Sequence, residues 1–335
     1  MGVRLRVGII GLGPAWESRH SPALHALADR FEVRAICDPV ARRAEFAARN
    51  WGIRHVDSFR KIVTAADVDA VMLLSARWYG ALPILAACDA GKAVYCAASL
   101  ELTEAEADMV EARVKGAGIA FMAEFPCRLA PATLRLKELI ATRLGEPRLL
   151  FCNQRLAASR NDGRPQSATV RQLVEMIDWC RYVVDAEPTS VMGTVHTSQE
   201  NQDQQDYLVM TLDFSTGGNV GTGPMAQIAC GSYVPNTWSE ANSFRRPADL
   251  QIICEKGIAF IDLPNSLVWF DGAGQHTESL ERDRPVGEQL LLHFYRSVSS
   301  LVLKTSSLDD AYRAVSILIH AQQSCTEGKR IRCDR

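Results

Sequence analysis

A glycine-rich turn close to the amino terminus carries the residues best suited to binding chemistry. The apolar run Val7–Ile10 breaks into a turn made of Gly11, Leu12, Gly13, Pro14, Ala15 and Trp16. Residues 17–24 then predict a helix, and a strand, a Gly-x-Gly turn and a helix form the start of a dinucleotide-binding βαβ unit. In such a unit Gly11 permits the tight turn, and Gly13 lets the backbone approach a pyrophosphate held by the amino end of the helix. These six turn residues are candidate cofactor contacts.

A carboxylate follows the second predicted strand. Residues 32–37 are a strand-like run that ends in Asp38, where a carboxylate can accept both ribose hydroxyls of an adenosine. Arg42 and Arg43 come shortly after it and would suit the 2′-phosphate of NADP, although a solvated helix face explains them equally well. The sequence therefore predicts NAD or NADP as the cofactor and leaves the choice between them open.

One residue of the turn departs from the dinucleotide pattern. The third glycine of Gly-x-Gly-x-x-Gly allows close packing of helix on strand, and Trp16 stands at that position. A glycine turn after a strand also occurs for structural reasons alone. A further alternative is that Trp16 fills the pyrophosphate space, so that no dinucleotide binds and the chain is a structural or interaction module.

The order of predicted elements indicates two domains. Six short strands alternate with helices over residues 1–123, and this alternation predicts a doubly wound parallel sheet, the Rossmann arrangement. Residues 124–335 contain successive strand-like runs without helices between them, which predict an α+β domain with an open, mostly antiparallel sheet. The runs expected there are 190–196, 207–214, 220–229, 250–254, 258–261 and 267–270. Two helices, 288–303 and 308–327, are expected to close this second domain.

Bulk properties exclude several classes of function. The chain has 335 residues, 47% of them hydrophobic, and a formal net charge of −2, which argues against a large nucleic-acid or acidic-membrane surface. The ten cysteines form no Cys-x-x-Cys pair and no zinc spacing with histidines, so no metal is expected. No signal peptide and no apolar run of about 20 residues are found, and the expected location is the cytoplasm.

Further motifs along the chain agree with one family. They are His20 after the turn, Asp69–Ser75, Ala86–Lys92, Pro131, Lys137–Ile140, Gly145–Glu146, Asp178–Tyr182 before Glu187 and Pro188, and Leu308–Ala311. Together they resemble the Gfo/Idh/MocA family of NAD(P)-dependent oxidoreductases. The resemblance implies a site formed by both domains and a homodimer or homotetramer associated through the open sheet. It also implies cofactor contacts at Ser75, Trp78, Ala97 and Ala98.

The two most informative family motifs are altered here. Members usually carry Glu-Lys-Pro, whose lysine assists proton transfer, where this chain has Ala97, Ala98 and Ser99. Members also carry Asp-x-Gly-x-His-x-x-Asp, and the corresponding residues are Arg171, Leu173, Glu175 and Asp178. Hydride transfer at a carbon bearing oxygen needs a group that moves the hydroxyl proton, which alanine cannot do. By these two motifs, the chain resembles a divergent member of the family.

Glu175 and Asp178 are the candidate catalytic residues. Glu175 is the one conventional acid or base at a family catalytic position, and burial would raise its pKa toward neutrality. An ion pair with Arg171, four residues earlier on a helix, is the structural alternative. Asp178 matches a position near the substrate, but a buried carboxylate bonded to Arg181 fits as well.

Two functions of different classes follow. The first is an oxidoreductase that transfers hydride to or from a sugar-like or polyol substrate, with unusual proton transfer; a reduced C=C or C=N bond would not need the family lysine. The second is an inactive relative that binds a dinucleotide or a sugar ligand as a sensor or partner subunit. Gly80 stands where members often carry the histidine of Thr-Pro-x-x-x-His. This change, together with those at Trp16, Ala98 and Glu175, favours the second function more than one change would.

Overall fold

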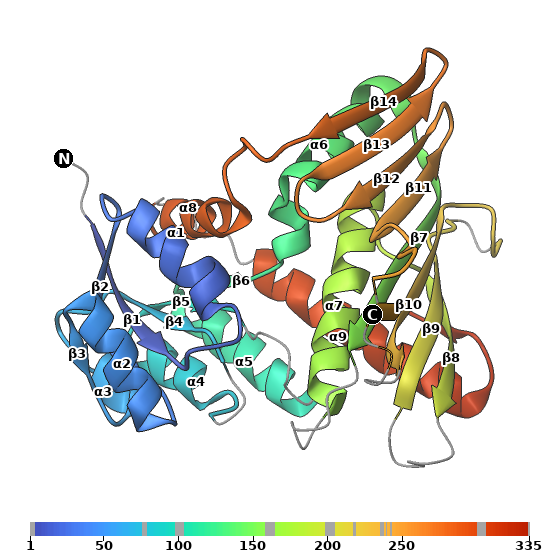
Figure 1. Ribbon diagram of the computed structural model, residues 1–335. Helices are drawn as coiled ribbons and strands as arrows, with labels where there is room; N and C mark the ends of the chain where they lie inside the picture. The colour runs from blue at the N-terminus through green and yellow to red at the C-terminus, as the bar shows by residue number, and fades with distance from the viewer. Residues whose placement is uncertain are drawn as a thin grey trace. The chain divides into compact units, whose positions relative to one another are not determined.

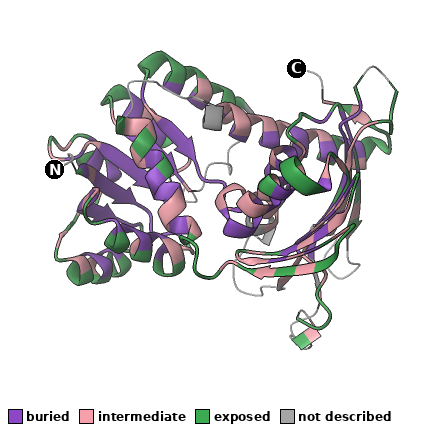
Figure 2. Ribbon diagram, turned by 90° about the horizontal axis from the view of Figure 1, so that it is seen from above, coloured by how far each residue is buried: buried purple, intermediate pink, exposed green. Residues whose placement is uncertain are grey.

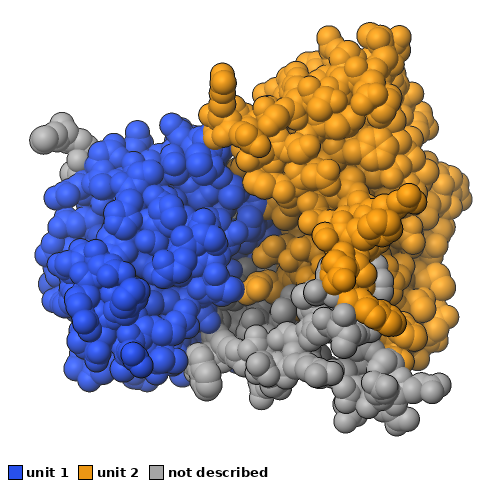
Figure 3. Space-filling model, viewed as in Figure 1, with its two compact units in different colours: residues 1–126, 284–313 blue, residues 127–283, 314–335 orange. Residues whose placement is uncertain are grey.

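The protein is described from a computed structural model that covers residues 4–333 except 76–78, 98–103, 158–164, 198–204, 217–218, 235–237, 239, 242 and 300–305. The chain forms two compact units (Figure 3). Unit 1 comprises residues 1–126 and 284–313, and unit 2 comprises residues 127–283 and 314–335. Each unit is described by itself.

A parallel sheet forms the centre of unit 1 (Figure 1). Its strands are β1 (Leu5–Ile10), β2 (Phe31–Cys37), β3 (Arg54–His55), β4 (Ala70–Leu73), β5 (Ala93–Cys96) and β6 (Phe121–Ala123). Their spatial order is β3-β2-β1-β4-β5-β6, and every described pair is parallel. This order changes direction beside β1, as in a doubly wound nucleotide-binding fold, and confirms the predicted Rossmann arrangement.

Helices cover the sheet of unit 1, which explains why its central strands β4 and β5 are apolar. They are α1 (Ser21–Ala26), α2 (Ala41–Trp51), α3 (Phe59–Val63), α4 (Leu82–Asp89), α5 (Glu104–Ala117) and α8 (Val286–Ser299). All four residues of β4 and of β5 are buried, as expected for strands covered on both faces. Figure 2 shows these central strands as a continuous buried layer.

The first helix begins with an irregular turn. Residues Trp16–His20 form a π-helical turn, η1, before α1 begins at Ser21, and the Ser21 amide donates to the Trp16 carbonyl. Pro22 has no N–H group to donate to the carbonyl of Ser18, so the regular α-helical pattern cannot continue through it. The sequence predicted one plain helix here, and the π turn is an addition.

The observed division of the chain departs from the expected one. The boundary lies after Pro126 instead of after residue 123, and unit 1 also contains residues 284–313. Helix α8 packs on α1, where Gly287 lies so close to Arg19 that a Cβ on it would be 2.8 Å from Arg19 Cγ. Phe294 of α8 is fully buried and meets the Tyr95 ring edge-on at 5.4 Å. These apolar contacts place α8 in unit 1, although it follows the second sheet in sequence.

Unit 2 contains a nine-stranded sheet in the order β14-β13-β12-β11-β7-β10-β9-β8-β15. Its strands are β7 (Pro147–Ala157), β8 (Ser190–Thr197), β9 (Gln205–Asp213), β10 (Met225–Val234), β11 (Leu250–Cys254), β12 (Ile258–Asp262), β13 (Ser266–Asp271), β14 (Gly274–Ser279) and β15 (Ile331–Arg332). Only β7 and β10 pair in parallel among the described strands, which confirms the mostly antiparallel sheet.

The helices of unit 2 lie on one face of this sheet (Figure 1). They are η2 (Pro126–Leu129), α6 (Pro131–Leu139), η3 (Ile140–Leu144), α7 (Pro165–Val184) and α9 (Ser306–Glu327), the last of which begins in unit 1. Trp179 of α7 is buried and donates its indole N–H to Thr133 Oγ1 of α6 at 3.0 Å, which fixes the two helices to each other. In the described part of the chain, no helix has the length and apolar character needed to cross a membrane.

Candidate functional site

The glycine turn of unit 1 lies directly on the end of β4. Gly11 has φ +71°, and a Cβ on it would be 2.7 Å from the Ser75 carbonyl oxygen. A Cβ on Gly13 would be 2.1 Å from the Leu74 carbonyl oxygen. Both partners are backbone atoms, so the space cannot be made by turning a side chain. The close approach of two backbones requires glycine at both positions.

Asp38 fixes the turn from the end of β2. Its Oδ2 accepts the Leu12 amide at 2.7 Å and its Oδ1 accepts the Val40 amide at 2.9 Å. Arg43 donates to the Leu12 carbonyl at 2.6 Å and has Nη1 3.9 Å from Asp38 Oδ2. Arg42 is exposed on α2. The carboxylate that the sequence assigned to the ribose thus also holds the middle of the turn.

Trp16 points into the helical layer. Its side chain is 3% exposed, and its ring centroid lies 6.1 Å from that of Trp51, the last residue of α2. Trp51 in turn contacts the His25 ring at 3.8 Å. The Trp16 indole therefore packs η1 against the end of α2.

The turn residues fit a dinucleotide phosphate. Within the described residues, the amides of Gly13 and Ala15 donate to no protein acceptor, whereas those of Leu12 and Trp16 do. Pro14 is exposed and Ala15 half-exposed. Amides left open at a glycine turn, with a carboxylate at the end of the next strand, are the donor and acceptor set that a pyrophosphate and a ribose require.

Other predicted cofactor contacts lie along the same edge of the sheet. Ser75 follows β4 beside Gly11, and the Ala97 amide donates to the Leu73 carbonyl at 2.9 Å. Trp78 and Ala98 lie outside the described residues. Tyr79 meets Phe59 edge-on and its hydroxyl lies 3.5 Å from Cys37 Sγ. Burial, followed by the contact with Cys37, raises the pKa of Tyr79, so the hydroxyl stays protonated.

A buried glutamate at this edge was missed by the sequence analysis. Glu124 directly follows β6, and its side chain is 1% exposed. Its Oε2 lies 2.8 Å from His20 Nε2 and accepts the Tyr95 hydroxyl at 2.8 Å, and Arg19 forms an ion pair with Oε1. A charged residue at the end of the last apolar run was the signal that could have found it.

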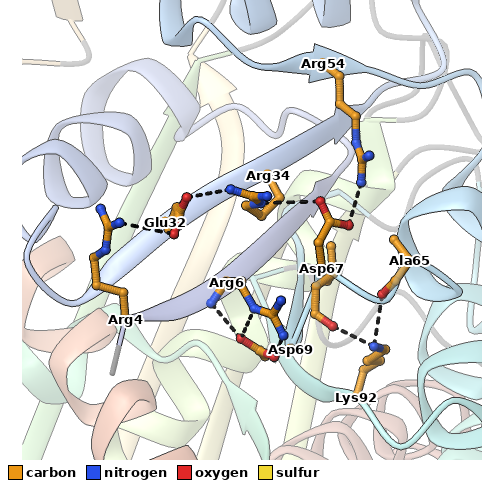
Figure 4. Close-up of polar contacts among 10 residues, drawn as sticks. Arg4, Arg6, Glu32, Arg34, Arg54, Ala65, Asp67, Asp69 and Lys92 are labelled. Atoms are coloured by element: carbon orange, nitrogen blue, oxygen red, sulfur yellow. Dashed lines mark hydrogen bonds and ion pairs between the residues drawn. The ribbon is translucent and has the colours of Figure 1, made fainter. Parts of the chain in front are cut away.

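The opposite edge of the sheet carries exposed ion pairs (Figure 4). Arg6 of β1 binds Asp69 through two side-chain hydrogen bonds of 2.9 and 2.6 Å. Arg34 of β2 bridges Glu32 and Asp67, and Arg54 pairs with Asp67 at 2.8 Å. The amino ends of the parallel strands are thus linked by solvent-accessible charges.

Helix α7 of unit 2 carries the predicted catalytic residues. Arg171 and Glu175 are half-buried, whereas Leu173 and Asp178 are buried. Their spacing places Arg171, Glu175 and Asp178 on one face of the helix. Glu175 is therefore partly accessible, and Asp178 is not.

Asp178 is held between two arginines. Arg128 of η2 donates its Nε to Asp178 Oδ2 at 2.6 Å and its Nη2 to Oδ1. Arg181 donates its Nη1 to Oδ1 at 3.4 Å, and its Nε and Nη2 donate to the two carboxylate oxygens of Glu187. Arg128 is stacked over the Tyr182 ring at 5.3 Å. These contacts use both carboxylate oxygens of Asp178, as expected for a buried carboxylate that is bonded to arginine.

No metal site was found in the part of the chain that the structure describes. No cluster of three or more histidine, cysteine, aspartate or glutamate side chains there has suitable geometry. The ten cysteines are free thiols, and eight of them are buried. They behave as small apolar side chains.

Comparison with known proteins gives a family match over the N-terminal domain. Residues 5–125 match the oxidoreductase family with an NAD-binding Rossmann fold, Gfo/Idh/MocA. Inositol 2-dehydrogenase 3 of Saccharopolyspora erythraea is 30% identical over 221 residues, which cover 64% of this chain and 65% of that protein. An inositol 2-dehydrogenase of Acidothermus cellulolyticus is 29% identical over 217 residues and 63% of each chain. The matched segment thus spans less than two thirds of either relative.

Solved structures share the fold over nearly the whole chain. A levoglucosan dehydrogenase in complex with NADH and levoglucosan superposes with a TM-score of 0.83 at 18% identity, covering 99% of this chain and 100% of that one. An aldose-aldose oxidoreductase from Caulobacter crescentus gives a TM-score of 0.84 at 17% identity over 98% of this chain and 100% of that one. The family match thus covers the N-terminal Rossmann domain at residues 5–125, and the solved structures share the fold over nearly the whole chain.

Proposed function

We propose that this protein is an NAD-dependent oxidoreductase acting on a sugar-like or polyol substrate. The observation that carries the proposal is the glycine turn held by the Asp38 carboxylate, with the Gly13 and Ala15 amides left open beside it. The relatives that match this chain are inositol 2-dehydrogenases, which supports a polyhydroxylated substrate. When bound, the nicotinamide ring supplies or accepts the hydride.

Asp38 favours NAD over NADP in this proposal. A carboxylate beside the adenosine ribose can accept its hydroxyls but repels a 2′-phosphate. Arg43 donates to the Leu12 carbonyl at 2.6 Å and forms an ion pair with Asp38 at 3.9 Å, so its guanidinium is held at the turn. Arg42 is exposed on α2 and is the cation left to meet a phosphate, so it is the residue through which NADP binding would have to occur.

Glu175 is the proposed proton-transfer residue. It stands where the resemblance places the family histidine, and its partial burial leaves it reachable. Asp178 then holds Arg128 in place, since both of its oxygens are bound by guanidinium groups. The substrate hydroxyl would lose its proton to Glu175 as the carbon that bears this hydroxyl gives up hydride to the nicotinamide.

The experiment is a screen of polyols and sugars with NAD, followed at the absorbance of NADH. Glu175→Gln should lower kcat by about 10²–10⁴-fold and leave the NADH dissociation constant unchanged. Glu138→Gln, a change of the same type at an exposed glutamate of α6, is the matched control and should retain full activity. Full kcat in Glu175→Gln would remove Glu175 from the mechanism.

A second candidate function is a non-catalytic binding protein. It is favoured by Leu173, which is 2% exposed where family members have glycine, together with Ala98 at the lysine position. NADH binding without turnover on any polyol in the screen, in a protein whose folding is verified, would support this function over the first.

A homodimer or homotetramer is also proposed, through the sheet face of unit 2 that its helices leave open. Leu149, Met192 and Phe270 on strands β7, β8 and β13 are 40%, 45% and 39% exposed. Each alternates with a buried neighbour, so these side chains lie on the face away from the helices. Light scattering should give an oligomeric mass that Phe270→Asp reduces; a monomeric wild type would contradict the proposal.

A further inference from the structure

A second buried carboxylate lies at the carboxyl end of the Rossmann sheet, and the proposed mechanism does not use it. Glu124 follows β6, Tyr95 is in β5, and Arg19 and His20 belong to the π turn η1. All four residues are in unit 1, and the side chains of Glu124 and His20 are 1% and 2% exposed. An ionised carboxylate at this depth is costly unless charged or hydrogen-bonding partners surround it.

The partners of Glu124 keep it ionised. Burial alone would raise its pKa, but the His20 hydrogen bond and the charges of His20 and Arg19 outweigh burial and lower the pKa overall. Tyr95 is fully buried, which raises the pKa of its hydroxyl and keeps it a donor to Glu124 Oε2. Three polar atoms of the cluster, Arg19 Nε, His20 Nδ1 and Glu124 Oε1, are buried without a hydrogen-bond partner among the described residues, and Oε1 is held by its ion pair with Arg19. The cluster is therefore held mainly through Glu124.

The cluster is connected to the glycine turn through the backbone. The amides of Arg19 and His20 both donate to the carbonyl of Ala15, at 2.9 and 3.1 Å. Ala15 is the residue whose own amide is left open for a phosphate. A side-chain link from Glu124 to Arg19 and His20 thus fixes the turn from its carboxyl side, while Asp38 fixes it from β2.

The position of Glu124 relates to a residue that this chain has lost. Family members carry the glutamate of Glu-Lys-Pro at the position of Ala97, by the resemblance described above. Strands β5 and β6 are paired with Cys96 opposite Ala123, and the Glu124 amide donates to the Cys96 carbonyl at 3.0 Å. Ala97 and Glu124 are therefore neighbours across adjacent strands, which lie about 4.8 Å apart.

We propose that Glu124 is a positioning residue for the dinucleotide turn, supplying directly after β6 the carboxylate that is missing at Ala97, directly after β5. It holds η1 in its π-helical form and Ala15 in the geometry that presents the turn to the cofactor. The proposal rests on the proposed function for the identity of the ligand. It does not rest on that function for the link between Glu124 and the turn.

The test combines amide hydrogen exchange of the free protein with NADH titration. Glu124→Gln should raise exchange in residues 15–20 and weaken NADH binding about tenfold. Ala97→Glu in the Glu124→Ala background should restore both, because it returns the charge to the neighbouring strand. Asp69→Asn, which breaks an ion pair at the opposite edge of the same sheet, is the matched control and should change neither (Figure 4).

The outcomes separate the two proposals. Exchange in residues 15–20 that is equal in wild type, Glu124→Gln and Asp69→Asn would overturn the positioning role, whether or not NADH binds. A wild type that binds no NADH, with exchange still raised in Glu124→Gln, would support the positioning role and contradict the proposed function. If Glu124→Gln does not fold, His20→Leu breaks the same link, and unchanged exchange in that variant would overturn the role.

Discussion

The two edges of the Rossmann sheet use the same kinds of charged residue in different ways. At the carboxyl edge, Asp38 and Glu124 are almost fully buried and bind the turn and its helix. At the amino edge, Asp69 and Asp67 keep about a third of their side chains exposed and link strand ends (Figure 4). Both edges follow from parallel strands, which gather all carboxyl ends on one side of the sheet.

Burial decides what each edge does. Exposed ion pairs are weak because solvent and salt screen them, so the amino edge contributes little beyond solubility and strand order. Buried carboxylates are strongly coupled to their partners, and losing one leaves other charges uncompensated. Substitutions at the carboxyl edge are therefore expected to alter both stability and cofactor binding, whereas those at the amino edge should alter neither by much.

The largest effect is expected for Gly13→Ala. The added Cβ would lie 2.1 Å from the Leu74 carbonyl oxygen, and the two backbones must separate to admit it. We expect a loss of about 3 kcal/mol in the free energy of unfolding and loss of NADH binding, measured by urea denaturation and titration. Gly116→Ala in α5, where a Cβ meets nothing within 4 Å, should instead stabilise the protein by about 1 kcal/mol. Equal stabilities of the two variants would contradict the close approach.

Glu124→Gln should produce the next largest effect, and it should depend on pH. The folded pKa of Glu124 is lowered, so its ion pairs stabilise the fold above the unfolded pKa of about 4.3 and are lost as pH falls through the folded pKa. We expect the free energy of unfolding of wild type to exceed that of Glu124→Gln by about 2 kcal/mol at pH 7. Urea denaturation at several pH values should show this difference in free energy of unfolding becoming smaller below about pH 4. A gap that is constant with pH would contradict the ionised state.

Asp38→Asn should lower stability less than Glu124→Gln does, and its main effect should be on cofactor binding. The asparagine oxygen can still accept the Leu12 N–H, but the NH2 group cannot accept the Val40 N–H, and the side chain no longer offers a charged acceptor to the ribose. We expect NADH binding about tenfold weaker and NADPH binding unchanged or improved, by fluorescence titration. A parallel loss of both cofactors would show that Asp38 acts only by holding the turn.

Asp69→Asn marks the smallest expected effect. The side-chain hydrogen bond from Arg6, followed by the hydrogen bond from the Arg6 amide and the Arg6 charge, lowers the pKa of Asp69. The stability that this ion pair contributes is therefore present above about pH 4 and lost as the pH falls further. We expect a slight decrease in Tm at low salt, abolished at about 1 M salt, and unchanged NADH affinity. A decrease comparable to that of Glu124→Gln would remove the distinction between the two edges.

Much of the fold could be predicted because its signals are local. The Rossmann topology was predicted from the glycine turn, the apolar runs of strand length and Asp38. The second sheet was predicted from the strand-like runs that begin at residue 190. Strand β10 begins at Met225, five residues later than expected. The segment before it is held as a turn, because Asp213 Oδ2 accepts the Gly221 amide and Ser215 Oγ accepts the amides of Thr222 and Gly223. Strand β14 was not expected, since its sequence, Gly274–Ser279, is polar and exposed.

The remaining features depend on contacts distant in sequence. Helix α8 joins unit 1 through Phe294 on Tyr95, which no local pattern indicates. The capture of Asp178 by Arg128 joins residues fifty positions apart. The sequence analysis begins the second domain at Glu124. The strand pairing shows that this residue lies beside Ala97, and a hydrogen bond joins it to His20.

The most direct test of the account is a titration of the purified protein with NADH, followed by energy transfer from tryptophan to the nicotinamide. Trp16 is engaged against Trp51 and leaves the turn open, so the account predicts saturable binding with a micromolar dissociation constant. Binding should be weaker in Asp38→Asn and lost in Gly13→Ala. No binding of NADH or NADPH at millimolar concentration, by a protein shown to be folded, would contradict the cofactor site.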